Sequence, residues 1–165
     1  MKILFLFRHA KSSWDDDSLS DFDRPLNDRG IAAAPFMGEV MAGRGYVPSI
    51  VVSSPANRAA STAKLVKEAG DLPGEIRFDD RIYEASPNTL RQVIAELDDN
   101  LDSAMAVGHN PGMEGFIRYL TGEIERMPTA ALAVIELEID KWSEINADSG
   151  KLVEIITPKD EMRSA

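Results

Sequence analysis

The chain has 165 residues, which suits one domain, and 44% of them are hydrophobic, enough for a sizeable core. Its 28 acidic and 18 basic residues give a net charge of -10, which disfavours nucleic acid and anionic lipid as partners. The absence of cysteine excludes disulfides, thiolate zinc sites and cysteine catalysis. With only two histidines, a multi-histidine metal centre is also difficult to build.

The N-terminal apolar run covers residues 3–7 and is too short for a secretory signal. No window reaches the ~18 consecutive apolar residues that a membrane span needs. The sequence therefore predicts a cytoplasmic protein with no membrane partner. Because the run has no polar alternation, it is typical of a parallel strand buried on both faces.

Apolar strand patterns and helical patterns alternate along the chain. Strands are predicted at residues 3–7, 49–53, 75–78, 103–107, 131–139 and 151–157. Helices are predicted from residue 27 or 28 to about 43, from 54 to about 70, from 86 through 97, and from 110 to about 120. Pro35 should kink the first helix, and Ser54 is expected to cap the second.

This order of elements predicts a three-layer α/β/α domain over residues 1–158, with a mostly parallel central sheet. The last two strands are expected to add an antiparallel edge, and residues 159–165 to form a solvated C-terminal tail. Only 50 residues separate Arg58 from His109, and predicted strands and helices occupy most of them. That segment leaves no room for a lid subdomain.

Polar side chains follow three of the predicted strands. Arg8 and His9 follow the first, Ser54 and Arg58 follow the second, and His109 follows the strand at 103–107. Because open α/β sheets bind ligands outside the carboxyl ends of their strands, these side chains are expected to converge. Helix N-termini at two of these positions also favour an anion. The pattern predicts a phosphate site without a metal.

The same residues resemble the motifs of a known family. Arg8-His9-Ala10 resembles the RHG/RHA signature of the histidine phosphatase superfamily, which includes proteins similar to phosphoglycerate mutase. Residues 53–59, Glu84 and residues 107–112 resemble its later motifs in the same order, and Arg24-Pro25-Leu26 fits the stretch before its first helix. The resemblance covers about residues 2 to 120, and the chain most resembles the small phosphohistidine phosphatases.

The resemblance implies that His9 is a nucleophile, which forms a phosphohistidine that water then hydrolyses. Arg8 and Arg58 are suited to clamp the phosphoryl oxygens, and their charges disfavour protonation of His9. His109 is expected to donate to the same oxygens as charge builds in the transition state. Glu84 is the candidate general acid and base. No metal and no cofactor are expected.

Three nearby features leave alternatives open. Ser12 is either a donor to the phosphoryl group or an ordinary loop hydroxyl. Arg24 either reaches the rim of the pocket or pairs with Asp21 or Asp23. The acidic run at residues 15–17 is either a solvated loop or a barrier to badly placed anionic substrates.

Together these residues predict a metal-independent phosphatase that acts on a phosphorylated protein bearing phosphohistidine. A small phosphate ester is the alternative substrate. Mutase chemistry, in which His9 returns its phosphoryl group to the substrate, needs closing elements that exclude water. A non-catalytic phosphate-binding module is disfavoured because His9, Arg58 and His109 are all present. The sequence does not predict the oligomeric state.

Overall fold

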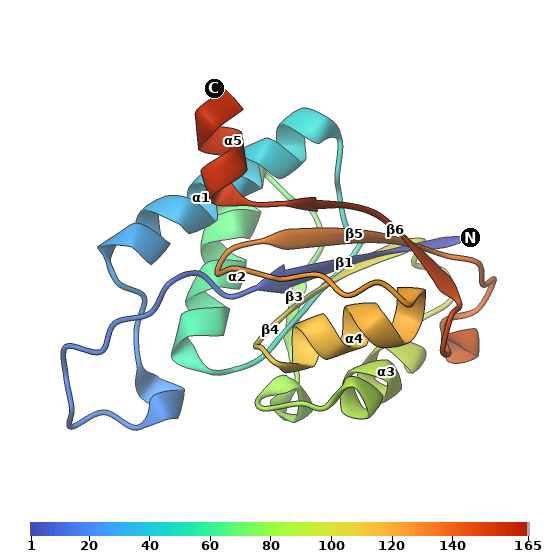
Figure 1. Ribbon diagram of the computed structural model, residues 1–165, viewed down its shortest axis with the longest axis horizontal. Coiled ribbons are helices and arrows are strands. Elements are labelled where there is room, and N and C mark those ends of the chain that lie inside the picture. Colours follow the sequence, from blue (N-terminus) through green and yellow to red (C-terminus); the bar gives the residue numbers. More distant parts are fainter. Residues whose placement is uncertain (165) are drawn as a thin grey trace.

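The computed structural model describes residues 1–164 and contains a six-stranded sheet with helices on both faces (Figure 1). The strands are β1 (Lys2–Arg8), β2 (Val51–Ser53), β3 (Ile76–Phe78), β4 (Ser103–Gly108), β5 (Leu132–Leu137) and β6 (Gly150–Ile156). They lie in the order β3-β2-β4-β1-β5-β6. The pairs β3-β2, β2-β4 and β4-β1 are parallel, so the predicted parallel centre is confirmed.

The last two strands, β5 and β6, add the predicted antiparallel part to one side of the sheet. β5 pairs antiparallel with both β1 and β6, so it lies inside the sheet and β6 alone forms the edge. The side chains of β5 explain this position, because Leu132 and Val134 are as buried as Ala133 and Ile135. β6 alternates exposed and half-buried residues over most of its length, as an edge strand does.

The helices are α1 (Asp28–Arg44), α2 (Asn57–Gly70), α3 (Pro87–Ala95), α4 (Gly112–Thr121) and α5 (Pro158–Ser164). Three short 3₁₀ helices also occur, η1 (Asp21–Asp23), η2 (Asp80–Ile82) and η3 (Trp142–Glu144). α1 and α2 cover one face of the sheet and α3 and α4 cover the other (Figure 1). None of the helices in residues 1–164 has both the length and the apolar composition needed to cross a bilayer.

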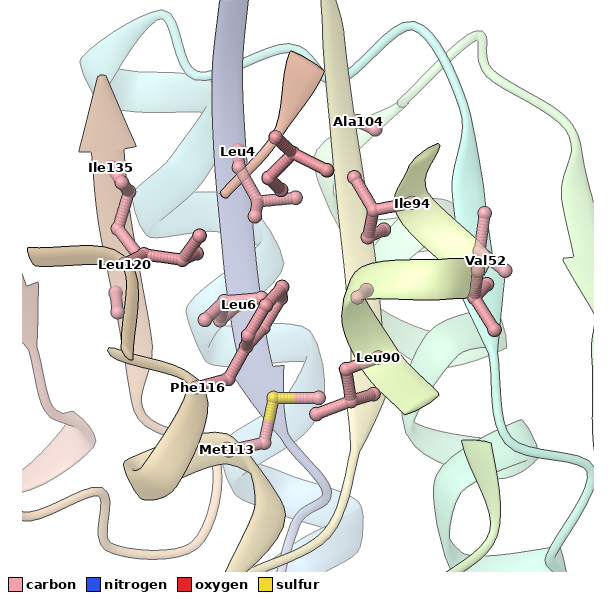
Figure 2. Packing of buried hydrophobic residues seen from close by; sticks show 14 of the residues in the cluster. Leu4, Leu6, Val52, Leu90, Ile94, Ala104, Met113, Phe116, Leu120 and Ile135 are labelled. Carbon is pink, nitrogen blue, oxygen red and sulfur yellow. The ribbon is translucent and has the colours of Figure 1, made fainter. Parts of the chain in front are cut away.

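Two hydrophobic cores follow from the apolar run of β1. Leu4 and Leu6 point into the core beneath α3 and α4, where they pack with Phe116 (Figure 2). Phe5 and Phe7 point into the core beneath α1 and α2. Burying each such side chain contributes about 1.5–3 kcal/mol, so β1 anchors both layers and fixes the position of the residues that follow it.

Asn27 and Ser86 cap helices close to the predicted starts, whereas the predicted cap at Ser54 is wrong. Asn27 accepts a hydrogen bond from the Gly30 N–H at the start of α1, and Ser86 accepts one from Thr89 at the start of α3. Ser54 does not cap α2, because that helix begins at Asn57 and its cap position has no side-chain hydrogen bond. The chain passes through Ser54 while still leaving the sheet, which sends the hydroxyl of Ser54 towards the neighbouring strand end.

The C-terminal residues differ from the expected tail, because α5 occupies most of them. Arg44, in the last turn of α1, pairs with Glu161 of α5 and lies 2.7 Å from a carboxylate oxygen of Glu154. These ion pairs join α5 to α1 and to the edge strand. The last residue of the expected tail, at position 165, lies outside the described residues.

Candidate active site

The four histidine and arginine side chains singled out in the sequence lie together at the carboxyl edge of the parallel strands. Arg8 ends β1 and His9 follows it, Arg58 lies in the first turn of α2, and His109 directly follows β4. A cavity of about 320 Å³ at this edge has these lining residues: Arg8, His9, Lys11, Ser12, Trp14, Arg24, Arg58, His109, Asn110 and Thr129. A second cavity of about 670 Å³ shares Arg58, His109 and Asn110 and is also lined by Glu84. The two cavities therefore adjoin.

His9 is held as a neutral imidazole with one nitrogen free. Its side chain is buried, and Nδ1 lies 2.7 Å from the carbonyl oxygen of Ala10. Because a carbonyl can only accept, Nδ1 carries the proton and Nε2 keeps its lone pair. Burial lowers the pKa of His9 to about 4, with further lowering by Arg58 and Arg8, while the bond to Ala10 opposes the shift. The two arginines lower the pKa as the sequence predicted, but burial of the imidazole is the larger cause of the shift.

A hydrogen-bonded chain that the sequence did not predict fixes the loop after β1. The Ala10 N–H donates to the Thr62 hydroxyl at 2.9 Å, and that hydroxyl donates to the Arg58 carbonyl at 2.7 Å. Thr62 thus joins the backbone that orients His9 to the helix that carries Arg58. Gly30 allows the first turn of α1 to press on the same loop, since a Cβ there would lie 2.2 Å from the Lys11 carbonyl oxygen.

Arg58 is buried and is held by Asp21 of η1. Its Nη1 donates to the Asp21 carbonyl at 2.7 Å, and its Nη2 donates to the Asp21 carboxylate at 3.0 Å. The Tyr83 hydroxyl donates to the same carboxylate at 2.6 Å. The hydrogen bond from Tyr83 is the main cause that lowers the pKa of Asp21, and the contacts with Arg58 lower it further. In return, the Asp21 carboxylate raises the pKa of Tyr83 to about 12. Asp21 is therefore an anion inside the rim of a cationic pocket.

Arg24 satisfies both alternatives that the sequence left open. Its Nε lies 3.2 Å from a carboxylate oxygen of Asp21, and its side chain lines the smaller cavity. The guanidinium carbon also lies 3.4 Å from the ring centroid of Trp14, a residue that is itself 73% exposed. Ser12 lines the same cavity, whereas the aspartates at 15–17 are exposed.

Arg8 is positioned from the opposite side of the pocket. Its Nη1 donates to the Met127 carbonyl at 3.0 Å. Glu114 accepts hydrogen bonds from the Met127 N–H and from the Asn110 amide, which ties the start of α4 to the loop before β5. Burial lowers the pKa of Arg8, and the charge of Glu114 opposes this shift. Glu114 and Asn110 are supporting residues that the sequence did not single out.

His109 packs beside His9, with ring centroids 5.1 Å apart. Its Nε2 lies 2.8 Å from the Ser54 hydroxyl oxygen, so Ser54 positions this ring instead of capping α2. Burial lowers the pKa of His109 to about 3, with smaller contributions from His9 and Arg58. When the Ser54 hydroxyl donates to Nε2, the ring proton lies on Nδ1 and becomes available to a ligand.

Three buried nitrogens of the site lack a hydrogen-bond partner among residues 1–164: Nε of Arg8, Nε of Arg58 and Nδ1 of His109. Buried polar atoms without a partner are rare, because each costs about 1–3 kcal/mol. All three belong to side chains that the sequence assigned to one phosphoryl group. Within the same residues, no three His, Cys, Asp or Glu side chains are grouped to hold a metal ion.

Glu84 lies at the larger cavity in an uncommon backbone conformation. Its φ of 55° is in the left-handed region, which costs a non-glycine residue on the order of 1 kcal/mol. The side chain is exposed, and in the described part of the chain its carboxylate forms no hydrogen bond or ion pair. The structure thus places a free carboxylate near Arg58 and His109.

The fold and the site define an α/β protein with paired histidines and arginines at the carboxyl edge of a parallel sheet. A family model described as histidine phosphatase superfamily (branch 1) matches residues 4–112, and the chain belongs to this superfamily. An uncharacterized chloroplastic protein of Arabidopsis thaliana, At3g52155, is 30% identical over 168 residues, which cover 94% of this chain and 77% of that protein.

Solved structures agree with this assignment. The crystal structure of SixA from Agrobacterium tumefaciens is 30% identical and has a TM-score of 0.82, covering 95% of this chain and 98% of that one. SixA in complex with tungstate has a TM-score of 0.83 at 21% identity, over 96% and 99% of the two chains. The fold is therefore that of phosphoglycerate mutase-like proteins, and residues 1–164 contain no lid subdomain.

Proposed function

We propose that this protein is a phosphatase that forms a phosphohistidine on His9 and that its substrate is phosphohistidine on another protein. One observation carries the proposal: His9 is buried and neutral, its Nδ1 is bonded to Ala10, and its Nε2 is free beside two arginines. A neutral imidazole with a fixed tautomer is ready to attack at neutral pH without first losing a proton.

In the first step Arg8 and Arg58 bind the equatorial oxygens of the phosphoryl group. The Nε2 lone pair of His9 then forms a bond to phosphorus, while the bond from phosphorus to the leaving group breaks. The leaving group takes a proton from the protonated carboxyl group of Glu84, which becomes a carboxylate, and His109 donates to the oxygens as their charge rises. The positive charge that develops on His9 is stabilised by the Ala10 carbonyl at Nδ1.

In the second step water attacks the phosphohistidine. Glu84, now a carboxylate, takes the proton of that water as the new P–O bond forms. The bond between phosphorus and Nε2 breaks, and its electron pair returns to His9 as a lone pair. Inorganic phosphate leaves, and both His9 and Glu84 regain their starting protonation states.

The choice of a protein substrate has two supports. Glu84 is exposed, so the larger cavity is accessible to a side chain that projects from a folded partner. The SixA of Agrobacterium tumefaciens is described as a candidate phosphohistidine phosphatase, and it aligns over nearly the whole chain. A cavity of about 670 Å³ also has room for a small phosphate ester, so the substrate is the part of the proposal to be measured directly.

The decisive experiment traps the covalent intermediate. Rapid quenching of the wild type during turnover should yield a phosphate linkage that is labile to acid and stable to base. His9→Ala should abolish this linkage, whereas the matched variant His109→Asn should still form it, more slowly. A His9→Ala protein that is folded by circular dichroism and keeps more than about a hundredth of the rate contradicts the proposal.

A hydrolysis panel then tests the substrate class. A protein domain phosphorylated on histidine is compared with small phosphomonoesters such as a sugar phosphate and p-nitrophenyl phosphate. We expect kcat/KM to be at least about tenfold higher for the phosphohistidine protein. A clear preference for a small ester would leave the proposed chemistry at His9 intact and would show that the substrate is a small phosphate ester.

A further inference from the structure

A third cavity, with a basic lining, adjoins the site. It has a volume of about 790 Å³ and lies between the loop after β1, the first half of α1 and the start of α5. We call it the basic cavity and define it by its cations, Lys11, Arg29 and Lys159. Lys11 and Thr129 line both this cavity and the smaller catalytic cavity, so the two adjoin.

The three cations of the basic cavity form no ion pair within residues 1–164. Among the described residues, none of the side chains of Lys11, Arg29 and Lys159 has a hydrogen-bond or ion-pair partner, and Asp160 is the one acidic residue in the lining. They come from three separate segments, and Lys159 lies far from the other two in the sequence, so a local basic run does not explain why they meet. In a chain with a net charge of -10, such a concentration of positive charge is an exception.

The remaining lining is mostly apolar. Ala32 and Ala33 of α1, Pro128 and Pro158 contribute to the walls, and Met162 of α5 is 51% exposed beside them. An apolar wall with cations at its mouth suits a ligand that combines an apolar group with a negative charge. A purely inorganic anion would leave the apolar wall unused.

The backbone between the two cavities is tied to the catalytic histidine. The Ala130 N–H lies 3.0 Å from the Arg8 carbonyl oxygen and 3.1 Å from that of His9. Ala130 also has a φ of 62°, which fixes the direction in which Thr129 leaves this turn. A group bound in the basic cavity is therefore held at a defined position relative to His9.

We infer that the basic cavity binds an acidic side chain of the substrate protein, on the same segment that carries the phosphorylated residue and next to an apolar residue. The inference rests on the proposed function and adds a sequence preference to it. Charge complementarity carries it, because Lys11, Arg29 and Lys159 attract a carboxylate that the largely acidic remainder of this protein repels. The contact should lower KM and leave kcat unchanged, because it acts away from the reacting atoms.

The test uses two synthetic phosphohistidine peptides that differ only in flanking residues, leucine with glutamates in one and leucine with glutamines in the other. Wild-type protein should hydrolyse the glutamate peptide with about tenfold higher kcat/KM at low salt, and the advantage should shrink as salt is added. Arg29→Ala/Lys159→Ala should remove the advantage through KM while hydrolysis of free phosphohistidine is unchanged. Arg29→Glu/Lys159→Glu should invert the preference.

The matched control is Lys141→Ala/Lys151→Ala, which removes the same charge. These lysines lie at or before the start of β6, at the end of the sheet away from the carboxyl ends of the parallel strands. This control variant should keep the preference. Equal kcat/KM for the two peptides in the wild type, or equal losses in the test and control variants, would overturn the inference.

Failure of the proposed function is separable from failure of the basic cavity. Calorimetric binding of the two unphosphorylated peptides tests the cavity without catalysis. If the protein hydrolyses no phosphohistidine but binds the glutamate peptide more tightly, the inference about the basic cavity holds and the proposed substrate is wrong. Equal binding of the two peptides would overturn the inference that the basic cavity binds an acidic side chain.

Discussion

Asp21 holds the Arg58 guanidinium with its carbonyl and its carboxylate, at 2.7 Å from Nη1 and 3.0 Å from Nη2. The two residues lie 37 positions apart, and η1 brings Asp21 to the mouth of the pocket. The contact orients the arginine, but it also places a negative charge where a phosphoryl group is expected to bind. Asp21 should therefore weaken the binding of anions while it positions Arg58.

Asp21→Asn separates these two effects. The variant retains the carbonyl contact and removes the charge, so inorganic phosphate should inhibit competitively with a Ki lower by about fivefold, since a nearby like charge is removed. The measurement is Ki at constant ionic strength. Asp23→Asn is the control, because the Asp23 carboxylate accepts a hydrogen bond from Ser20 and does not contact Arg58. Weaker phosphate binding in Asp21→Asn would show that positioning dominates.

Arg58→Lys tests the requirement for a planar fork. Lysine keeps the positive charge but cannot bind two oxygens side by side or reproduce both contacts to Asp21, so kcat should fall at least about tenfold. Arg91→Lys is the matched control and should be unaffected, because the half-buried Arg91 contacts Asn88 within α3 and does not line either cavity of the site. A near-normal rate for Arg58→Lys would mean that Arg58 acts as a distant charge.

Metal independence is expected from the composition, because the chain has no cysteine and both histidines lie at the proposed phosphate site. Dialysis against EDTA should leave the rate unchanged. Vanadate, which resembles the transferring phosphoryl group, should inhibit the dialysed protein. Loss of activity on chelation, followed by recovery with a divalent ion, would disprove the mechanism.

The sequence predicted those features of the fold that depend on local pattern. The unbroken apolar run of β1, the caps at Asn27 and Ser86, and the order of strands and helices were all readable, because each depends on residues close in sequence. The burial of both faces of β5 was harder to predict, because it depends on the packing of Leu132 and Val134 against residues distant in the sequence.

The supporting contacts of the site depend on packing between distant segments and could not be predicted. Ser54-Pro55 and Ser86-Pro87 have the same local pattern, yet Ser86 caps a helix and Ser54 contacts a histidine 55 residues away. Thr62 likewise meets Ala10 across 52 residues. Motif resemblance named the residues that face the phosphoryl group, but not the residues that hold them in place.

Acid should destabilise the fold between pH 6.5 and about 4. His9 and His109 have pKa values of about 4 and about 3, below the 6.5 of an ordinary histidine. In this window the unfolded chain binds protons that the folded chain excludes, so the free energy of unfolding falls as pH falls and is constant above it. For His9 alone the loss is on the order of 3 kcal/mol, since one pKa unit equals about 1.4 kcal/mol.

Urea unfolding at a series of pH values measures this slope. His9→Gln/His109→Gln should flatten it in the same window, because glutamine does not titrate. Carboxylates with lowered pKa values, such as Asp21, lose their stabilising effect mainly at pH values below this window. A double variant as pH-sensitive as the wild type would show that other groups cause the acid destabilisation.

Glu84→Gln joins the proposed acid to the choice of substrate. An alkoxide is a poor leaving group and needs a proton from Glu84, whereas the P–N bond of phosphohistidine is weak and needs less help. The first chemical step should slow by about a hundredfold with an alkyl phosphate and by less than about tenfold with phosphohistidine. Glutamine keeps the size of the side chain and the same backbone at φ 55°.

The experiment must separate the two steps, because the attack of water on the phosphohistidine is common to both substrates and also uses Glu84. Single-turnover formation of the phosphoenzyme, followed by rapid quenching, isolates the first step. Glu75→Gln is the control, because Glu75 is an exposed glutamate directly before β3. It lies at the amino ends of the parallel strands, away from the site at their carboxyl ends. Equal slowing of the first step with both substrates would exclude Glu84 as the proton donor to the leaving group. A defect confined to steady-state turnover would assign Glu84 to the activation of water alone.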